Sequence, residues 1–130
     1  MKDKYDLAGI VIGLAMKVHA TLGAGFLESV YHKALAHELR KAGLNFESEK
    51  ALSASYDGVL VGEFSADLLV EADLIVELKA VQNLATAHEV QTVNYLVATG
   101  KDTGLLLNFG AGSLEFKKKF RLPRQKLSTE

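Results

Sequence analysis

Two carboxylates and a lysine are spaced so that they could bind a metal ion and act on a phosphate. Asp67, Glu77 and Lys79 lie in two apolar, β-prone runs that are separated by a polar break at residues 71–73. This pattern predicts an antiparallel hairpin with a three-residue loop. If the loop is centred on Ala72, Asp67 lies directly opposite Glu77. Lys79 follows two residues later and therefore points to the same face of the hairpin as Glu77.

The chemistry that this arrangement favours is metal-assisted hydrolysis. Facing carboxylates repel each other, and a hard divalent cation such as Mg²⁺ or Mn²⁺ would hold them together. The backbone carbonyl of Leu78 could add a further ligand. The ion would polarise a phosphoryl oxygen and lower the pKa of a bound water, while Lys79 could orient that water or stabilise charge on the phosphate. The alternative is a solvent-facing hairpin with a Glu–Lys ion pair, and a register slip of one residue would turn Asp67 to the other face.

Two other groups of polar side chains occur at helical spacing. Gln91 and Tyr95 are four residues apart, and His88 lies on the same stripe of one predicted helix. An amide and a phenol placed there could hold a phosphate or the attacking water beside the metal, or they could be the polar flank of an amphipathic helix. Glu28 and Tyr31 share one face at the start of another predicted helix. Glu28 could be a third acidic ligand, or it could simply stabilise the helix N-terminus.

The remaining patterns indicate the elements that must position these residues. Apolar side chains at helical spacing predict helices over residues 5–22, 26–42 and 84–99. The last helix is expected to turn four side chains inward: Val90, Val93, Leu96 and Val97. Strands are predicted over 45–56, which the hairpin turn Asp57-Gly58 closes, over the two runs that hold the acids, and over 103–109 and 113–121.

The resulting order, α-α-β-β-β-α-β-β, is that of an α/β protein. The helix over 84–99 connects two strands and therefore implies that they are parallel, with a right-handed crossover. A chain of 130 residues suits one domain. We expect this domain to span residues 1–121 and to be followed by a loose tail, residues 122–130, around the single proline, Pro123.

Composition excludes several classes of site and compartment. The chain has no cysteine, which excludes disulfides, a cysteine nucleophile and cysteine-ligated zinc or iron–sulfur sites. No histidine pair has the spacing of a His-Glu-x-x-His zinc site. His19 is expected to be a hydrogen-bonded packing residue, and His32 and His37 are expected to be exposed. The sequence has neither the layout of a signal peptide nor an apolar run long enough for a membrane helix, so a cytoplasmic protein is expected.

The charge distribution limits how nucleic acid could bind. A net charge of −1 means that any nucleic acid must meet a local basic patch. One such patch lies near the end of the chain, and the alternative is a solvated strand and tail. Its members are Lys117, Lys118, Lys119, Arg121, Arg124 and Lys126.

Taken together, the three constellations resemble one known group of enzymes. Asp67…Glu77-Leu-Lys79 resembles the core motif of the PD-(D/E)XK nuclease superfamily. Gln91-Thr-Val-Asn-Tyr95 is similar to the Gln-x-x-x-Tyr motif of its RecB-type branch. Gly25-Phe-Leu-Glu28-Ser-Val-Tyr31 is similar to the signature of the GxxExxY family of small bacterial proteins. The resemblance covers roughly residues 5–121 and implies a restriction-endonuclease-like fold, with a central mixed sheet flanked by helices on an αβββαβ core.

The resemblance also implies roles for single residues. Glu28, Asp67 and Glu77 would be the acidic metal ligands, Lys79 the catalytic lysine, and Gln91 and Tyr95 its helix partners. Ala66 stands where the name of the motif has proline. RecB-type relatives with an iron–sulfur cluster need cysteines, which this chain lacks. Superfamily members without catalysis have usually lost the acid or lysine positions, whereas this chain retains them.

The function implied is a Mg²⁺-dependent nuclease that hydrolyses phosphodiester bonds in DNA, with RNA not excluded. The short chain leaves little room for a separate DNA-reading module, so weak sequence preference, a protein partner or dimerisation is expected. Three other functions are compatible with the residues. They are a non-cleaving binding module, a structural or regulatory subunit that uses the N-terminal helices as an oligomer interface, and a metal-dependent hydrolase of a small phosphorylated substrate.

Overall fold

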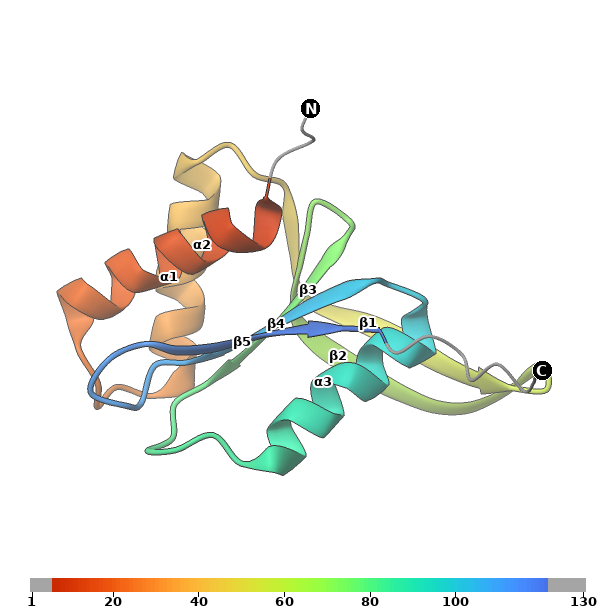
Figure 1. The fold of residues 1–130 in the computed structure, drawn as a ribbon. Coiled ribbons are helices and arrows are strands. Elements are labelled where there is room, and N and C mark those ends of the chain that lie inside the picture. The colour runs from red at the N-terminus through yellow and green to blue at the C-terminus, as the bar shows by residue number, and fades with distance from the viewer. Residues whose placement is uncertain (1–5, 122–130) are drawn as a thin grey trace.

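The computed structural model describes residues 6–121 of the 130-residue chain. The predicted tail over residues 122–130, with Arg124 and Lys126, lies outside the described residues. Within them, three helices and five strands follow in the predicted order (Figure 1). Their bounds are α1 Leu7–Leu22, α2 Glu28–Lys41, β1 Phe46–Tyr56, β2 Val59–Val70, β3 Leu74–Lys79, α3 Thr86–Thr99, β4 Thr103–Asn108 and β5 Glu115–Phe120. No helix among these is long and apolar enough to cross a membrane.

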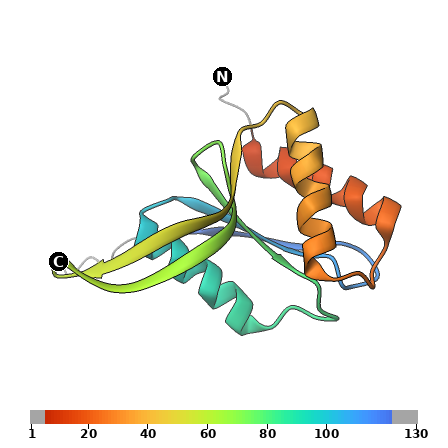
Figure 2. The same ribbon diagram turned by 180° about the vertical axis from the view of Figure 1, so that it is seen from behind.

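The five strands form one mixed sheet in the order β1-β2-β3-β4-β5. All neighbouring strands are antiparallel except β3 and β4, which are parallel and joined through α3, as predicted. Helices α1 and α2 lie on one face of the sheet and α3 lies on the other (Figures 1 and 2). The restriction-endonuclease-like α/β fold is therefore confirmed.

Two tight turns set the register of the first three strands. Asp57 and Gly58, between β1 and β2, both have positive φ, at 54° and 78°, as a two-residue hairpin turn requires. The β2–β3 loop contains the three predicted residues, because β2 ends at Val70 and β3 begins at Leu74. Its backbone turns back through positive φ at residues 71 and 72. The short loop holds the two acid-bearing strands in the predicted register.

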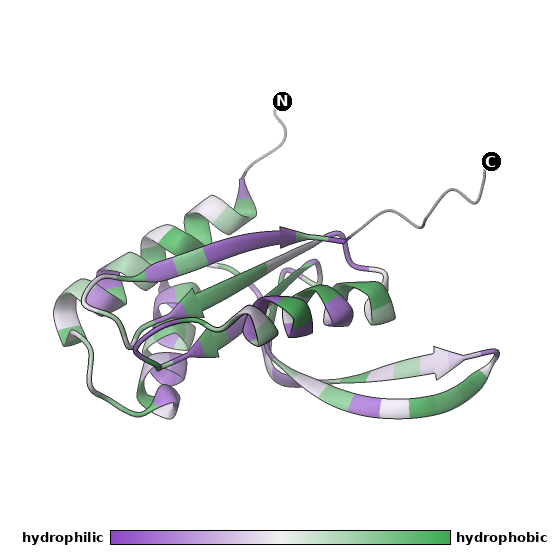
Figure 3. Ribbon diagram, turned by 60° about the horizontal axis from the view of Figure 1, so that its bottom comes forward, coloured by the Kyte–Doolittle hydropathy of each residue, from purple (hydrophilic) through white to green (hydrophobic). Residues whose placement is uncertain are grey.

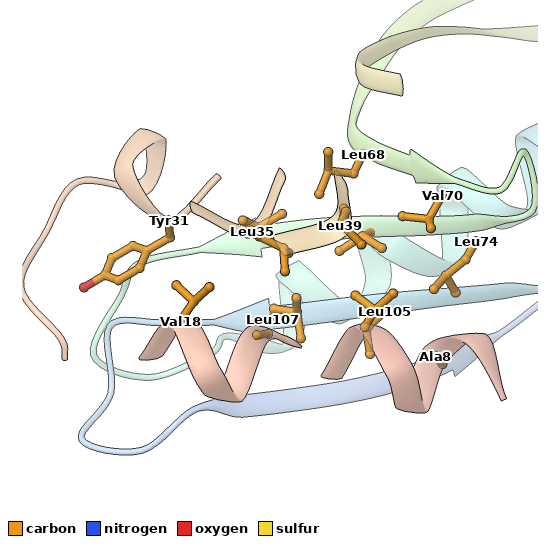
Figure 4. Packing of buried hydrophobic residues seen from close by; sticks show 14 of the residues in the cluster. Ala8, Val18, Tyr31, Leu35, Leu39, Leu68, Val70, Leu74, Leu105 and Leu107 are labelled. Atoms are coloured by element: carbon orange, nitrogen blue, oxygen red, sulfur yellow. The ribbon is translucent and has the colours of Figure 1, made fainter. Parts of the chain in front are cut away.

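The larger core lies between the sheet and helices α1 and α2. Figure 4 shows leucines of β2, β3 and β4 meeting α1 and α2, with Tyr31 at one end. Burial of each leucine, isoleucine or valine contributes roughly 1.5–3 kcal/mol, so this layer provides most of the stability. The fully buried members include Val11, Ala15, Tyr31, Leu35, Leu39, Leu68, Val70, Val76, Leu78, Leu105, Leu107 and Phe109.

The smaller core, under α3, contains a correction to the sequence prediction. Leu96 is buried, but Val90 and Val97 are 52% and 55% exposed, so their predicted inward orientation is wrong. The reason is the contact with β4 at Gly104, where an added Cβ would lie 3.0 Å from the Thr92 methyl group. The helix can approach the strand this closely only by turning Thr92 and Leu96 toward the sheet, which places the two valines outside.

The β1–β2 hairpin continues well past the rest of the sheet. Strand β2 pairs with β3 only over residues 68–70, whereas it pairs with β1 over almost its whole length. The two strands therefore form an arm that projects away from α1 and α2 (Figures 1 and 2). Apolar segments alternate with polar ones along this arm (Figure 3). Its tip exposes Tyr56, Val59, Leu60 and Val61.

Candidate active site

The predicted acid pair lies where β2 and β3 separate. Backbone pairing of the two strands ends at Leu68 and Val76, and Asp67 and Glu77 occupy the next position on each strand. At this position, hydrogen bonds from the backbone to the two carboxylates take the place of backbone–backbone hydrogen bonds between the strands. The Asp67 N–H donates to Glu77 Oε2 at 3.0 Å, and the Leu78 N–H donates to Asp67 Oδ2 at 2.7 Å. Each carboxylate is therefore anchored by the opposite strand, which confirms that the two acids face each other.

One acid of the pair lies in the protein interior. Glu77 is only 5% exposed. Burial raises the pKa of its carboxyl from the ordinary 4.5 to about 8, and the Asp67 carboxylate contributes next most to this rise. The hydrogen bond from Asp67 and the positive charge of Lys79 act in the opposite direction but do not cancel it. A nearby cation would stabilise the ionised form of the Glu77 carboxyl.

The donor set of this pair fits a hard divalent cation. The hydrogen bonds to the described part of the chain use only one oxygen of each carboxylate, Oδ2 of Asp67 and Oε2 of Glu77. Their other oxygens are the ligand type that Mg²⁺ and Mn²⁺ prefer. Within residues 6–121, however, no three histidine or acidic side chains converge in metal-binding geometry. Glu28 therefore does not complete a three-acid set with the pair.

Lys79 and Leu78 follow the acids on β3. Lys79 is half-buried at the end of the strand, and its charge lowers the pKa values of both Glu77 and Glu28. The side chain of Leu78 lies in the larger core, and its N–H binds Asp67. The role of its carbonyl as a metal ligand stays a prediction.

The Gly-x-x-Glu-x-x-Tyr segment divides into structural and chemical positions. Gly25 has a φ of 113°, which favours glycine. The Tyr31 hydroxyl donates to the Gly23 carbonyl and accepts the Phe26 N–H at 3.1 Å, so it secures the loop before α2. Tyr31 is fully buried and its ring stacks on Phe109 at 4.7 Å. Its role is structural.

Glu28, the first residue of α2, is the chemical position of that segment. Partial burial raises the pKa of its carboxyl, and the charge of Asp67 raises it further. The positive charges of neighbouring side chains lower it, namely those of Lys79, His32 and His88. Glu28 thus belongs to the electrostatic surroundings of the acid pair, although it lies at the surface of the molecule.

Helix α3 brings an amide and a phenol toward the acids. Gln91 Nε2 donates to the Tyr95 hydroxyl at 3.0 Å, which confirms that they share one stripe. The Tyr95 ring stacks on Phe64 of β2 at 4.1 Å. Burial raises the pKa of the Tyr95 hydroxyl, and the charges of Glu77 and then Asp67 add to the rise. His88, on the same stripe, accepts the Ala85 N–H through Nδ1 at 3.1 Å.

The basic residues of β5, and Arg121 directly after it, lie apart from this constellation. β4 separates β5 from β3, so the backbone of Lys117 is about 10 Å from that of Glu77 across two strand spacings. Three of the four have acidic partners. Lys118 pairs with Asp6 at 3.8 Å, Lys119 with Glu89 at 3.0 Å and Arg121 with Asp102 at 2.8 Å. A phosphate would have to displace these carboxylates.

Other polar residues of this region had different outcomes. His19 is buried and its Nε2 lies 2.9 Å from the Ala111 carbonyl, which confirms its packing role. Sequence reasoning missed Phe64, because nothing local indicates that it would meet Tyr95. It also missed Asn108, which is buried and whose Oδ1 accepts the N–H groups of Val81 and Gly110. Asn108 thereby holds the backbone just beyond Lys79.

The comparison with protein families decides the kinship of this chain. Residues 5–121 match the sequence model of the PD-(D/E)XK nuclease superfamily. The chain belongs to this superfamily. Ala66 occupies the position where the PD-(D/E)XK motif has its proline. Its side chain is fully buried in the smaller core.

A solved structure agrees at the level of the fold. The chain is similar to the protein in the "Crystal structure of SSO0001", with a TM-score of 0.59 and 18% sequence identity over 74% of this chain and 52% of that one. The chain thus spans about half the length of SSO0001, and at this identity the likeness concerns the fold alone. No curated protein matches the sequence.

Proposed function

We propose that this PD-(D/E)XK protein is a Mg²⁺-dependent nuclease that hydrolyses phosphodiester bonds in DNA. One observation carries the proposal: a buried Glu77 faces Asp67, and the described part of the chain does not compensate the second negative charge that ionisation of Glu77 would create. The motif resemblances further support placing the chain in the GxxExxY family and in the RecB-type branch. A cytoplasmic location and a single domain over residues 1–121 are part of the same proposal.

The metal would be held by the free carboxylate oxygens of Asp67 and Glu77. The carbonyl of Leu78 would add a direct ligand, and the Glu28 carboxylate would take part through a bridging water. When bound, Mg²⁺ or Mn²⁺ supplies charge stabilisation at the phosphate and a more acidic water. Glu28 borders the pair electrostatically, which supports its share in this site.

The other side chains would position the phosphate. Lys79 carries the positive charge closest along β3 to the acid pair, and it would orient the attacking water or stabilise charge that develops on the phosphate. The Tyr95 hydroxyl accepts the Gln91 amide N–H and can donate its own hydrogen to a phosphate oxygen, and its raised pKa favours this protonated form. Gln91 holds that hydroxyl in place and offers an amide beside it. Contacts of Lys117, Lys118, Lys119 and Arg121 with the flanking backbone stay a prediction from the sequence and are not part of this proposal, because Lys118, Lys119 and Arg121 already pair with carboxylates.

A cleavage assay tests this function. Circular single-stranded DNA and linear double-stranded DNA would be incubated with Mg²⁺, Mn²⁺ or EDTA. Wild-type protein should cut only with metal, and Asp67→Asn and Lys79→Met should abolish cutting. Lys17→Met is the matched control, because Lys17 pairs with Glu38 on the helical side. Cutting of the circle would make the enzyme an endonuclease. Absence of cutting under every metal, or full activity of Lys79→Met, would reject the assignment.

A second function, a non-cleaving nucleic-acid-binding or partner-dependent regulatory subunit, is favoured by two observations. No three acidic or histidine side chains converge within residues 6–121. The projecting arm also exposes apolar side chains at its tip, a surface suited to a protein partner or a second copy. Such a subunit would bind DNA in EDTA, and Glu77→Ala would leave that binding intact.

A further inference from the structure

A groove runs between α2 and the base of β1. Figure 2 shows α2 and β1 on the side of the molecule where the groove lies. Its volume is about 460 Å³. The α2 residues in its wall recur at intervals of three or four, so they form one face of the helix. The lining consists of Ser29, His32, Lys33, Ala36, Arg40, Ser48 and Glu49.

One end of the groove lies beside Glu28 at the start of α2. Ser29 follows Glu28 directly, and the charge of His32 lies near enough to act on the Glu28 carboxyl. On the other wall, Ser48 pairs with Leu68, the neighbour of Asp67 on β2. Asp67 alternates with Leu68 along β2 and therefore points to the α3 face of the sheet. A strand lying in the groove would reach the acids by passing the N-terminus of α2, beside Glu28.

The other end of the groove lies at Arg40. From Ser29 to Arg40 the helix rises about 16 Å at 1.5 Å per residue, which matches four or five nucleotides at about 3.4 Å each. The Arg40 guanidinium lies over the Phe46 ring, 5.2 Å from its centroid. This contact restrains the guanidinium and leaves its N–H groups free to bind a phosphate.

The charge of the groove also suits a nucleic-acid backbone. Lys33 and Arg40 are exposed, and neither forms an ion pair with any residue between 6 and 121. Glu49 is the one acid in the lining, and it lies on β1 between Ser48 and Lys50, which pair with Leu68 and Ala66 of β2. By contrast, Lys118 of β5 and Arg121, which follows β5, are already paired with carboxylates.

We infer that the α2–β1 groove binds the sugar–phosphate backbone of one nucleic-acid strand and leads that strand to Asp67 and Glu77. Lys33 and Arg40 contact the phosphates, and the hydroxyls of Ser29 and Ser48 hydrogen-bond beside them. The inference rests on the proposed function in that the strand bound here is the substrate of the same site.

The test is binding in EDTA, where cleavage cannot occur. The affinity of the full chain for a fluorescein-labelled single strand of about 20 nucleotides would be measured by anisotropy across a salt series. Lys33→Gln/Arg40→Gln is compared with Lys118→Gln/Arg121→Gln, which removes the same charge from β5. Two lost phosphate contacts lower the affinity about 25-fold at 0.1 M salt and reduce the salt slope by about 1.4. The β5 variant is expected to bind within about twofold of wild type.

Several outcomes would overturn the inference. They are wild-type affinity in the groove variant, an equal or larger loss in the β5 variant, and no binding by the wild-type chain. If Arg40→Gln disturbs folding through the lost contact with Phe46, as a thermal melt would show, Lys33→Glu alone decides the question. The outcomes for the proposed nuclease are separate. A wild-type chain that never cuts rejects the nuclease, while the binding series still judges the groove. A groove variant that binds and cuts like wild type rejects the groove alone.

Discussion

Replacement of Glu77 by glutamine should stabilise the metal-free protein at alkaline pH while removing its activity. Glutamine has nearly the same shape as glutamate and can still accept the Asp67 N–H through its carbonyl oxygen. What it removes is a carboxylate that is 5% exposed and lies beside a second carboxylate. In wild-type protein without metal, the ionised form of this group opposes folding.

The pH dependence follows from the two pKa values. Below about pH 4.5 the group is protonated in both folded and unfolded protein, so it contributes no difference. Between 4.5 and about 8 the unfolded chain is ionised and the folded chain holds the proton, so wild-type stability falls as pH rises. Above pH 8 the wild-type protein has lost at most about 5 kcal/mol of stability, because each pH unit between the two pKa values corresponds to 1.36 kcal/mol. This is a large part of the 5–15 kcal/mol typical of a domain.

Urea denaturation in EDTA measures this directly. Glu77→Gln should match wild type near pH 4.5 and exceed it by several kcal/mol at pH 9. Added Mg²⁺ should stabilise wild type at pH 8 and leave the variant unchanged. Glu63→Gln, at an exposed arm position, controls for the substitution itself. A variant less stable than wild type at pH 9, or a stability difference that does not change with pH, would show that Glu77 is not a buried, uncompensated acid.

Three other substitutions test the supports of the site. Tyr31→Phe removes the hydroxyl that holds the loop over residues 23–26 and should cost about 1–3 kcal/mol in urea denaturation; an unchanged midpoint would contradict its structural role. Gly104→Ala places a Cβ 3.0 Å from the Thr92 methyl and should cost about 1–3 kcal/mol, with partial rescue by Thr92→Ser in the same thermal melts. Tyr95→Phe keeps the ring stack but removes the phosphate donor, so the cleavage rate should fall about 10- to 100-fold with the melting temperature nearly unchanged; a normal rate would exclude the donor role.

The acid pair could be placed from the sequence because its geometry is local. Asp67 and Glu77 are ten residues apart, and a three-residue loop between two apolar runs leaves little freedom in how they face each other. The same applies to Gln91 and Tyr95, whose contact depends only on helical spacing. Gly58 marked the turn between β1 and β2 because its positive φ is unfavourable for other residues.

Features that depend on contacts between distant segments could not be predicted from local sequence patterns. The rotation of α3 depends on how closely Thr92 approaches Gly104, so the periodicity of its valines indicated the wrong face. The basic residues of β5 looked available for phosphate until Asp6, Glu89 and Asp102 were brought beside them.

By itself, then, the sequence determined the order of the elements, the facing acids and the helical pairs, because short-range backbone geometry controls each of them. Only the tertiary structure decided how deeply Glu77 is buried, which basic residues remain unpaired within residues 6–121, and that a groove lies between α2 and β1. These three features depend on packing between residues far apart in the chain. The packing that forms is the one that buries the most apolar surface and pairs the most charged groups.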